Sequence, residues 1–452
     1  MAQSSQSTDM PEVRIQAPAL PVGGGVRSSS LRAAFSWAFV GNVVYAGCHW
    51  GNLVVLTKLT SPERVGQYAL GFAIALPVLM FTHLQMRTLV TSDVRQQTAF
   101  GHYLTMRLLS TAAGLVTICA IPLWFGLSPE STRIIWVVGI AQSVEAISEI
   151  FHARLQLHDR MDRIATSLLL RGLLGLLAMG LGVLATGSVF WGLTGLATVR
   201  LLVLIGFDAY PRIHAPREQA AGEQAVRLRA EWNGRVLRGL FWAAIPLGLI
   251  GLLVSLQSNI PRYFIQAHLG ERELGIFSAI GFLLSSGSLV IGSLGQSAFT
   301  RLALYYAEER RGEFGRLLKK LLGVAALLGT GGVLVAWVAG RQILTVLFRP
   351  EYGERAHLLV WLMVAAGVSY LAQILGYAMT AARYFVHQVP LFALTVVTVT
   401  LASYLLVPSW GLAGAIAALL ITVLVQLIGS AAILYRAVRR TPSPNNEVVS
   451  FV

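Results

Sequence analysis

Three runs of polar side chains lie at helical spacing inside long apolar stretches of the sequence. Because their members recur every three, four or seven residues, each run shares one helical face. The runs are Asn42, Tyr45, His49 and Asn52; Ser255, Ser258, Asn259 and Arg262; and Tyr370, Gln373, Tyr377 and Thr380. Polar groups facing lipid are costly, so these faces should turn toward protein or water. One residue, such as His49, is explained by an interhelical hydrogen bond. Three runs favour a water-filled cavity, and we predict that Asn52 and Asn259 line it where it opens outward.

Five ionisable residues lie at membrane depth, where such groups are functional candidates: Glu145, Glu149, Arg171, Arg200 and Asp208. Since consecutive antiparallel helices usually touch, we predict that Arg171 pairs with Glu145 or Glu149. Asp208 lies two turns from Arg200 on the same helix, too far for a direct pair. Arg200 is therefore the preferred ligand for an anionic substrate group, with Arg171 and Arg262 as further candidates. Arg200→Ala should then abolish transport without preventing insertion. Glu145 and Glu149 are also candidates for coupling transport to an ion.

The sequence carries no motif for covalent or metal-dependent catalysis. No GxxxxGK[ST], HExxH, CxxC or GxSxG pattern occurs in a suitable context, so nucleotide hydrolysis and zinc- or serine-dependent chemistry are not expected. The two cysteines, Cys48 and Cys119, cannot alone supply a disulfide framework or a zinc site. We therefore predict no enzymatic activity, no cofactor and no metal. Transport would draw on an ion gradient, the membrane potential or the substrate gradient.

The elements that must position these side chains are membrane-spanning helices. Mean hydropathy is +0.65, with 12% charged and 55% hydrophobic residues, a balance typical of polytopic membrane proteins. A helix needs about 20 apolar residues to cross the hydrocarbon core. An all-α protein with twelve such spans is predicted, at about 35–57, 68–88, 103–126, 134–153, 164–186, 189–209, 238–259, 275–298, 319–340, 356–381, 387–407 and 410–435.

An internal repeat divides the chain into two related halves. Three motifs recur in the same order: LTSPERVGQY at 59 and LGERELGIF at 269, FG at 100 and 314, and WGLTG at 191 and WGLAG at 410. The first pair aligns Gly66 with Gly275, a separation of 209 residues (275 − 66). An ordered repeat of this length predicts two pseudo-repeated lobes of six helices each.

The predicted organisation follows from the repeat and from the distribution of charge. It comprises a polar N-terminal tail at 1–33, an N-lobe at 34–210, a linker at 211–237, a C-lobe at 238–436 and a C-terminal tail at 437–452. Of the 35 Lys and Arg residues, 25 lie in the tails and connections on one side and 8 in the opposite connections. By the positive-inside rule, the richer side, with both termini, is cytoplasmic. The net charge of +14 then faces anionic lipid, and no nucleic-acid partner is expected.

Several segments resemble bacterial lipopolysaccharide and polysaccharide flippases of the Wzx type. They are FVGNVVYAGCHWGNLVVLTKL from Phe39, LTSPERVGQYALGFAIALPVLM from Leu59 and LQLHDRMDRIATSLLLRG from Leu155. LTVLFRPEYGERA from Leu344 is similar to the segment before the tenth helix in the same superfamily (MOP), which includes the multidrug exporters (MATE) and the lipid II flippase MurJ. The resemblance covers residues 31–440. It implies two six-helix lobes in a V around a central cavity that opens to each side in turn.

The resemblance also implies a cargo and partners. The cargo is an undecaprenyl-diphosphate-linked oligosaccharide, an O-antigen or exopolysaccharide repeat unit, carried across the bacterial inner membrane. A proton or sodium counter-ion and other polysaccharide-assembly proteins are the implied partners. Two alternatives stay open. A MATE-type exporter of drugs or cations should present acidic cavity residues, whereas an anionic cargo needs arginines. A membrane glycosyltransferase or polymerase is disfavoured by the repeat and by the short outer loops.

Overall fold

The computed structural model describes residues 31–93, 98–210, 229–382 and 384–439. All regular elements of these segments are helices. They are α1 (Leu31–Leu59), α2 (Pro62–Thr82), α3 (Met86–Ser92), α4 (Phe100–Trp124), α5 (Pro129–Leu157), α6 (Met161–Thr186), α7 (Val189–Val203), the π-helix η1 (Leu204–Asp208), α8 (Gly234–Ala307), α9 (Arg311–Leu347), α10 (Pro350–Gly353), α11 (Ala356–Ala381) and α12 (Phe385–Arg439).

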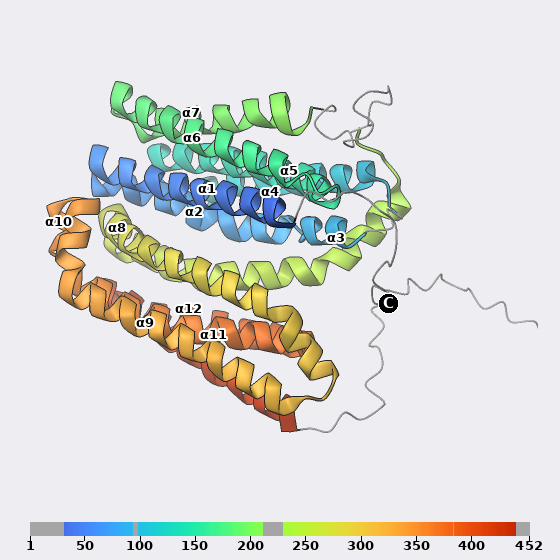
Figure 1. Cartoon of the computed structure of the whole chain (residues 1–452). Helices are drawn as coiled ribbons and strands as arrows, with labels where there is room; N and C mark the ends of the chain where they lie inside the picture. Colours follow the sequence, from blue (N-terminus) through green and yellow to red (C-terminus); the bar gives the residue numbers. More distant parts are fainter. Residues whose placement is uncertain (1–30, 94–97, 211–228, 383, 440–452) are drawn as a thin grey trace, which may run out of the picture.

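Ten helices in the described part of the chain are long and apolar enough to cross a membrane. Two of them, α8 and α12, are each broken by a glycine in a positive-φ conformation, Gly270 (φ 83°) and Gly411 (φ 58°). The chain turns back at Gly270, so α8 consists of a first limb (234–269) and a second limb (271–307) (Figure 1). With α8 and α12 each counted as two limbs, the described residues contain twelve membrane-length segments. The predicted all-α polytopic fold is confirmed.

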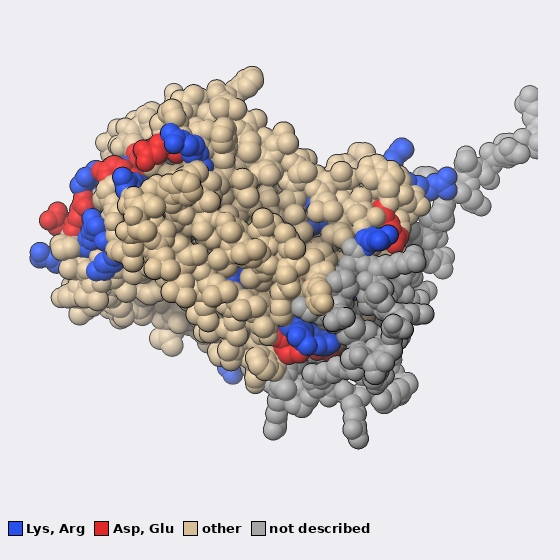
Figure 2. Space-filling view, turned by 90° about the horizontal axis from the view of Figure 1, so that it is seen from above, with Lys and Arg blue, Asp and Glu red and all other residues tan. Residues whose placement is uncertain are grey.

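Charged side chains gather at the two ends of the molecule (Figure 2). The broad band between the ends is almost free of charge on this face. Large apolar side chains are exposed on the membrane-length helices, among them Leu181, Trp337 and Leu401. Such a surface suits hydrocarbon because it presents no polar group that needs water. The chain is a multi-pass membrane protein.

The turns at one end are shorter than the sequence predicts. α1 ends at Leu59 and α2 begins at Pro62, so most of the stretch between the predicted spans 35–57 and 68–88 is helical. Proline suits the first helical position because no backbone N–H is needed there, and Glu63 in the first turn complements the helix dipole. The stretch between the predicted spans 238–259 and 275–298 is likewise helical except for the kink at Gly270.

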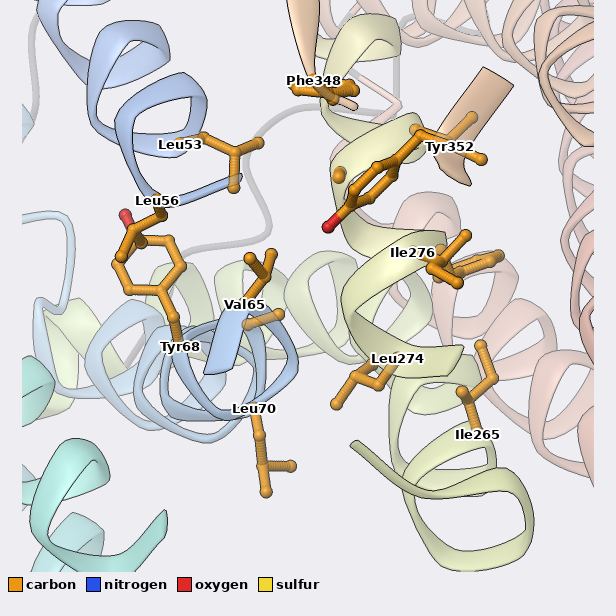
Figure 3. Close-up of a cluster of buried hydrophobic side chains, with 14 of the residues drawn as sticks. Leu53, Leu56, Val65, Tyr68, Leu70, Ile265, Leu274, Ile276, Phe348 and Tyr352 are labelled. Carbon is orange, nitrogen blue, oxygen red and sulfur yellow. The ribbon is translucent and has the colours of Figure 1, made fainter. Parts of the chain in front are cut away.

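The two halves of the chain pack together at this end, which we call the closed end. One apolar core joins α1 and α2 of the first half to α8, α9 and α10 of the second (Figure 3). Leu56 and Val65 on one side and Phe348 and Tyr352 on the other are completely buried in it. From the closed end, α9, α11 and α12 diverge from α1 to α7 (Figure 1). Apart from the first limb of α8, the second half therefore contacts the first half mainly at this end.

Gly66 and Gly275, the two glycines aligned by the repeat, face each other at the closed end. A Cβ atom added at Gly66 would overlap the carbonyl oxygen of Glu271, and one added at Gly275 would overlap that of Pro62. The backbones of α2 and α8 thus approach to a distance that only glycine permits. The two positions that the repeat aligns are therefore in contact across the two halves.

Polar side chains also join the halves around these glycines. Contacts across the closed end include Gln67 to Glu271 (2.9 Å), Ser131 to Glu271, Arg272 to Glu63 (3.0 Å), and Arg349 to the carbonyl oxygen of Lys58 (2.7 Å). Arg272 contacts Glu351 of α10 as well. Glu63 and Arg272 are themselves 209 residues apart. The Glu63–Arg272 pair therefore joins equivalent positions of the repeat, as the glycine pair does.

The first limb of α8 leans on the first half of the chain. Leu237 and Ala244 share an apolar core with Leu84 and Leu104. Further along, Gly248 packs closely on a backbone carbonyl group of α2. The boundary between the two packed bodies therefore passes through α8 and does not coincide with the boundary between the sequence repeats.

The second repeat motif holds the chain just before α8. A Cβ atom added at Gly101 would lie 2.6 Å from the carbonyl oxygen of Arg229, and the Glu231 N–H donates to the Gly101 carbonyl (3.2 Å). A Cβ atom added at the equivalent Gly315 would meet nothing within 4 Å in the described chain. The glycine of the repeated FG motif is a point of close approach in the first half only.

Three of the predicted segments fall largely outside the described residues. These are the N-terminal tail, the linker and the C-terminal tail, of which 1–30, 211–228 and 440–452 are not described. Where the structure does describe their ends, helix extends further than predicted: α1 begins at Leu31, α8 at Gly234, and α12 ends at Arg439. The lobe bounds at 34, 238 and 436 otherwise stay a prediction.

We expect the closed end to face the periplasm. Ser61→Cys and His268→Cys, in a background lacking Cys48 and Cys119, should react with an impermeant thiol reagent added to intact spheroplasts. His268 replaces the neighbouring Gly270, whose φ of 83° would strain a cysteine. Arg310→Cys, at the opposite end of the molecule, is the matched control and should react only after lysis. The reverse pattern would place both termini outside.

Candidate functional site

A cavity of about 530 Å³ lies between the halves, away from the closed end. α2 and the residues that follow it form one wall, and the first limb of α8 forms the other. The lining is apolar except for five uncharged polar side chains: Gln85, Thr88, Ser255, Ser258 and Asn259. Since Gln85 and Thr88 follow the end of α2, the cavity lies toward the end of the molecule from which α8 begins (Figure 1). No charged side chain of the described residues lines it.

The polar face predicted on the seventh span lies on the cavity wall. Ser255, Ser258 and Asn259 line the cavity, and Arg262 follows one turn later on the same face. The Arg262 Nη1 donates a hydrogen bond to the Asn259 Oδ1 (2.8 Å). The Arg262 side chain is half-buried, its Nε lacks a hydrogen-bond partner, and none of the described acidic residues forms an ion pair with it.

A cluster of polar side chains surrounds Arg200 inside the first half. The Arg200 Nη1 lies 2.8 Å from a carboxylate oxygen of Glu145 and donates to the Gln142 side chain (2.6 Å). The Arg200 Nη2 contacts the His49 ring (3.2 Å), and the Tyr45 hydroxyl donates to Glu145. Arg200 is 2% exposed. α1, α5 and α7 thus supply a neutral arrangement in which the arginine already has a carboxylate.

A second cluster joins α5, α6 and η1. The Arg171 Nη2 lies 3.9 Å from an Asp208 carboxylate oxygen, and the His152 Nε2 lies 3.4 Å from the other oxygen. The same guanidinium nitrogen is 2.8 Å from the His152 Nε2, and His152 also contacts Ser167 (3.1 Å). All four side chains are buried. Asp208 ends the π-helical turn, which directs its carboxylate toward α6.

A third pair fixes α4 to α5. The Arg107 Nη2 lies 3.4 Å from a Glu149 carboxylate oxygen, and its Nη1 donates to the His83 carbonyl oxygen (3.2 Å). The His83 ring lies 3.8 Å from the same carboxylate. Arg107 is 1% exposed. The three buried arginines of the first half therefore each contact a carboxylate.

The predicted pairing of these charges is wrong. Arg171 contacts Asp208 rather than Glu145 or Glu149, and Arg200 is neutralised by Glu145. The prediction assumed that consecutive helices are neighbours, but α6 packs mainly against α1 and α7, while α5 packs against α2, α4 and α7. Arg107 and His152 were missed although both lie within predicted spans, at 103–126 and 134–153. A count of every ionisable residue inside a span would have found them.

The polar face of α1 lies away from the described cavity. Tyr45 and His49 belong to the Arg200 cluster. Asn52 is 3% exposed and its Oδ1 lacks a hydrogen-bond partner, whereas Asn42 is exposed and donates to the Ala38 carbonyl (2.7 Å). The expectation that Asn52 and Asn259 share one outward-opening cavity does not hold in this conformation, because only Asn259 lines it and it lies away from the closed end.

The polar face of α11 packs inside the second half. The Tyr370 hydroxyl donates to the Leu284 carbonyl (3.2 Å), and Gln373 donates to Ser369 (3.3 Å). The Tyr370 and Tyr377 rings lie on glycines of the second limb of α8. These three predicted residues therefore do not line the described cavity, and a role for them in transport stays a prediction.

In the second half, a cluster of uncharged polar side chains joins α8 to α12. The Gln257 side chain of α8 donates to Gln426 (2.8 Å) and accepts from Thr395 (2.9 Å), both on α12. Thr395 is completely buried and Gln257 is 9% exposed. Among the described residues there is no group of three His, Cys, Asp or Glu side chains that could hold a metal ion.

Known proteins are similar to this chain in sequence and in architecture. No protein-family model matches it. The capsular polysaccharide biosynthesis protein CapF of Staphylococcus aureus is 24% identical over 399 residues, which cover 87% of this chain and 96% of CapF. The inward-facing conformation of a multidrug resistance MATE family transporter of the MOP superfamily superposes with a TM-score of 0.72 at 13% identity, covering 90% of this chain and all of that one. The chain has the fold of the MOP transporter superfamily. The resemblance seen in the sequence is confirmed at that level.

The similarity to MATE transporter structures also depends on the conformation of those structures. An outward-facing conformation of a MOP-superfamily MATE transporter gives a TM-score of 0.58 at 14% identity, covering 90% of this chain and 94% of that one. The MOP fold of this chain is thus closer to the inward-facing arrangement. The greater similarity agrees with helices that meet at the closed end and diverge from it.

Proposed function

We propose that the chain is a flippase that moves an undecaprenyl-diphosphate-linked oligosaccharide across the bacterial inner membrane by alternating access. The observation that carries the proposal is a cavity between two repeated halves that are packed shut at one end. Closing the cavity side and separating the closed end would expose the same wall to the other face of the membrane. The similarity to CapF supports a saccharide cargo.

The composition of the cavity wall favours a saccharide over a cationic drug. Its polar groups are hydroxyl and amide side chains, which exchange hydrogen bonds with sugar hydroxyl groups. An exporter of cations needs a carboxylate at its site, and the carboxylates at membrane depth in the described first half are engaged with arginine or histidine. No observation favours the alternative of a membrane glycosyltransferase or polymerase.

We further propose that the structure corresponds to the inward-open state, with both termini in the cytoplasm. The basic side chains of the tails and linker then face anionic lipid. The half-buried carboxylates Glu145 and Glu149 are the candidates for coupling transport to a proton or sodium ion. Other polysaccharide-assembly proteins are the expected partners, since the cargo is made and used by membrane enzymes.

The experiment that tests this function is transfer of fluorescent undecaprenyl-diphosphate-linked oligosaccharide in proteoliposomes. Cargo placed in one leaflet should become accessible to an impermeant glycosidase on the other side only when the protein is present. Empty vesicles are the control for spontaneous transfer, and a fluorescent quaternary ammonium drug is the control for the exporter alternative. Uptake of the drug without movement of the glycolipid would contradict the proposal.

A further inference from the structure

The arginines of the two halves differ in what neutralises them. Arg107, Arg171 and Arg200 of the first half each contact a carboxylate. Arg262, in the first limb of α8, has only the Asn259 amide oxygen as a side-chain partner among the described residues. Arg262 lies eight residues before the Gly270 kink, about 12 Å along the helix at about 1.5 Å per residue. A cation so far from the membrane surface needs a counter-charge.

The position of Arg262 places this cation next to the cavity. Ser255 and Ser258 line the cavity on the same helical face, and Asn259 links that lining to the guanidinium group. The Arg262 Nε is buried and has no hydrogen-bond acceptor, beside the Nη1 that donates to Asn259. A guanidinium group binds phosphate through two parallel N–H donors, and hydroxyl groups nearby can complete the oxygen coordination.

We propose that Arg262 and Asn259 form an anion site that takes the diphosphate of the cargo at the end of the cavity nearest the closed end. The inference rests on the proposed flippase function and adds an orientation to it. The diphosphate lies beside Arg262, and the saccharide extends along Ser255 and Ser258 toward the open part of the cavity. The arginines of the first half stay with their carboxylates and do not contact the cargo.

Binding to purified protein in nanodiscs of neutral phosphatidylcholine tests the site without requiring transport. The probes are undecaprenyl diphosphate and the neutral lipid undecaprenol, detected by native mass spectrometry. Wild-type protein should prefer the diphosphate. Arg262→Ala should lower that preference by about tenfold or more, as expected for loss of a charge-assisted pair, and Arg262→Lys should retain part of it. Arg341→Ala, an exposed arginine of α9, is the matched control and should bind as wild type does.

A second variant tests the site with Arg262 in place. Asn259→Asp puts a carboxylate within 2.8 Å of the guanidinium group and should abolish the preference for diphosphate by neutralising Arg262. If Arg262→Ala folds and binds the diphosphate as wild type does, the inference is overturned. If Arg262→Ala does not fold, unchanged binding by Asn259→Asp overturns it instead. Equal competition by phosphatidylglycerol would also overturn it, because the site would then belong to a membrane lipid.

If wild-type protein moves the glycolipid and folded Arg262→Ala moves it equally well, the site is wrong and the flippase function stands. If wild-type protein moves no glycolipid, the function fails.

Discussion

Gly275→Ala and Gly66→Ala are each expected to reduce transport by at least about tenfold and to shift the protein toward the outward-open state. A methyl group at either position would overlap a backbone carbonyl oxygen of the facing helix, so the closed end cannot pack as observed. Overpacking of this kind costs about 1–3 kcal/mol, which corresponds to about a 5- to 150-fold change in the ratio of the two states. In the proposed outward-open state the second limb of α8 would be separated from α2, so that state would not bear this cost.

The shift can be measured by the reactivity of a single cysteine at Gln67, which is 5% exposed at the closed end. Labelling by an impermeant reagent from the periplasm should be slow in the parent protein and faster with Gly275→Ala. Gly281→Ala is the matched control, because this glycine lies in the same limb of α8 with open space beside it. Normal transport and a protected Gln67→Cys in the Gly275→Ala protein would show that the contact does not gate access.

Arg200→Gln and Glu145→Gln should each lower the amount of folded protein sharply, and the double variant should recover much of it. The two side chains are 2.8 Å apart, with Arg200 2% exposed. Removing one partner leaves an uncompensated buried charge, which costs about 3–5 kcal/mol, whereas removing both leaves none. The measurements are membrane yield and the thermal unfolding midpoint in detergent.

The identity of the partner is tested by a mismatched pair. Combining Arg200→Gln with Glu149→Gln should give no recovery, because Glu149 contacts Arg107 instead. Recovery in this combination, and not with Glu145→Gln, would contradict the observed arrangement. The sequence alone predicts that Arg200→Ala abolishes transport with normal insertion. The structure instead predicts a loss of folded protein, since this arginine holds α5 and α7 together.

The fold could be predicted from local features of the sequence. Apolar length fixes which segments cross the membrane, and three motifs in the same order predicted the repeat that aligns Gly66 with Gly275. The contact between these two glycines became visible only in the structure. The helix ends were less accurate because α2 begins at Pro62, inside a polar stretch that composition alone assigns to a turn. A polar stretch can be helical where it lies beside an interface between packed helices, so polarity alone does not mark the end of a helix.

The charge pairs could not be predicted because they depend on which helices are neighbours. Depth along the membrane normal placed Glu145 and Arg171 at similar levels, but depth leaves the position within the membrane plane undetermined. Asp208 reaches Arg171 through the π-helical turn η1, a backbone feature with no signature in the local sequence. Arg262 could be identified as a candidate from its helical face. That none of the described acidic residues pairs with it could be seen only once the helices were placed relative to one another.

The Glu63–Arg272 pair has a consequence for how the two halves recognise each other. In a symmetric dimer, equivalent positions near the two-fold axis carry the same residue on both sides. Two glycines at equivalent positions can pack against each other, but two glutamates at equivalent positions would repel each other. The chain carries Glu63 and Arg64 in one half and Arg272 and Glu273 in the other, so the signs are reversed between the copies. With the signs reversed, unlike halves place Glu63 against Arg272, whereas two copies of the same half would place like charges together. The two halves are therefore complementary to each other and not interchangeable at this contact.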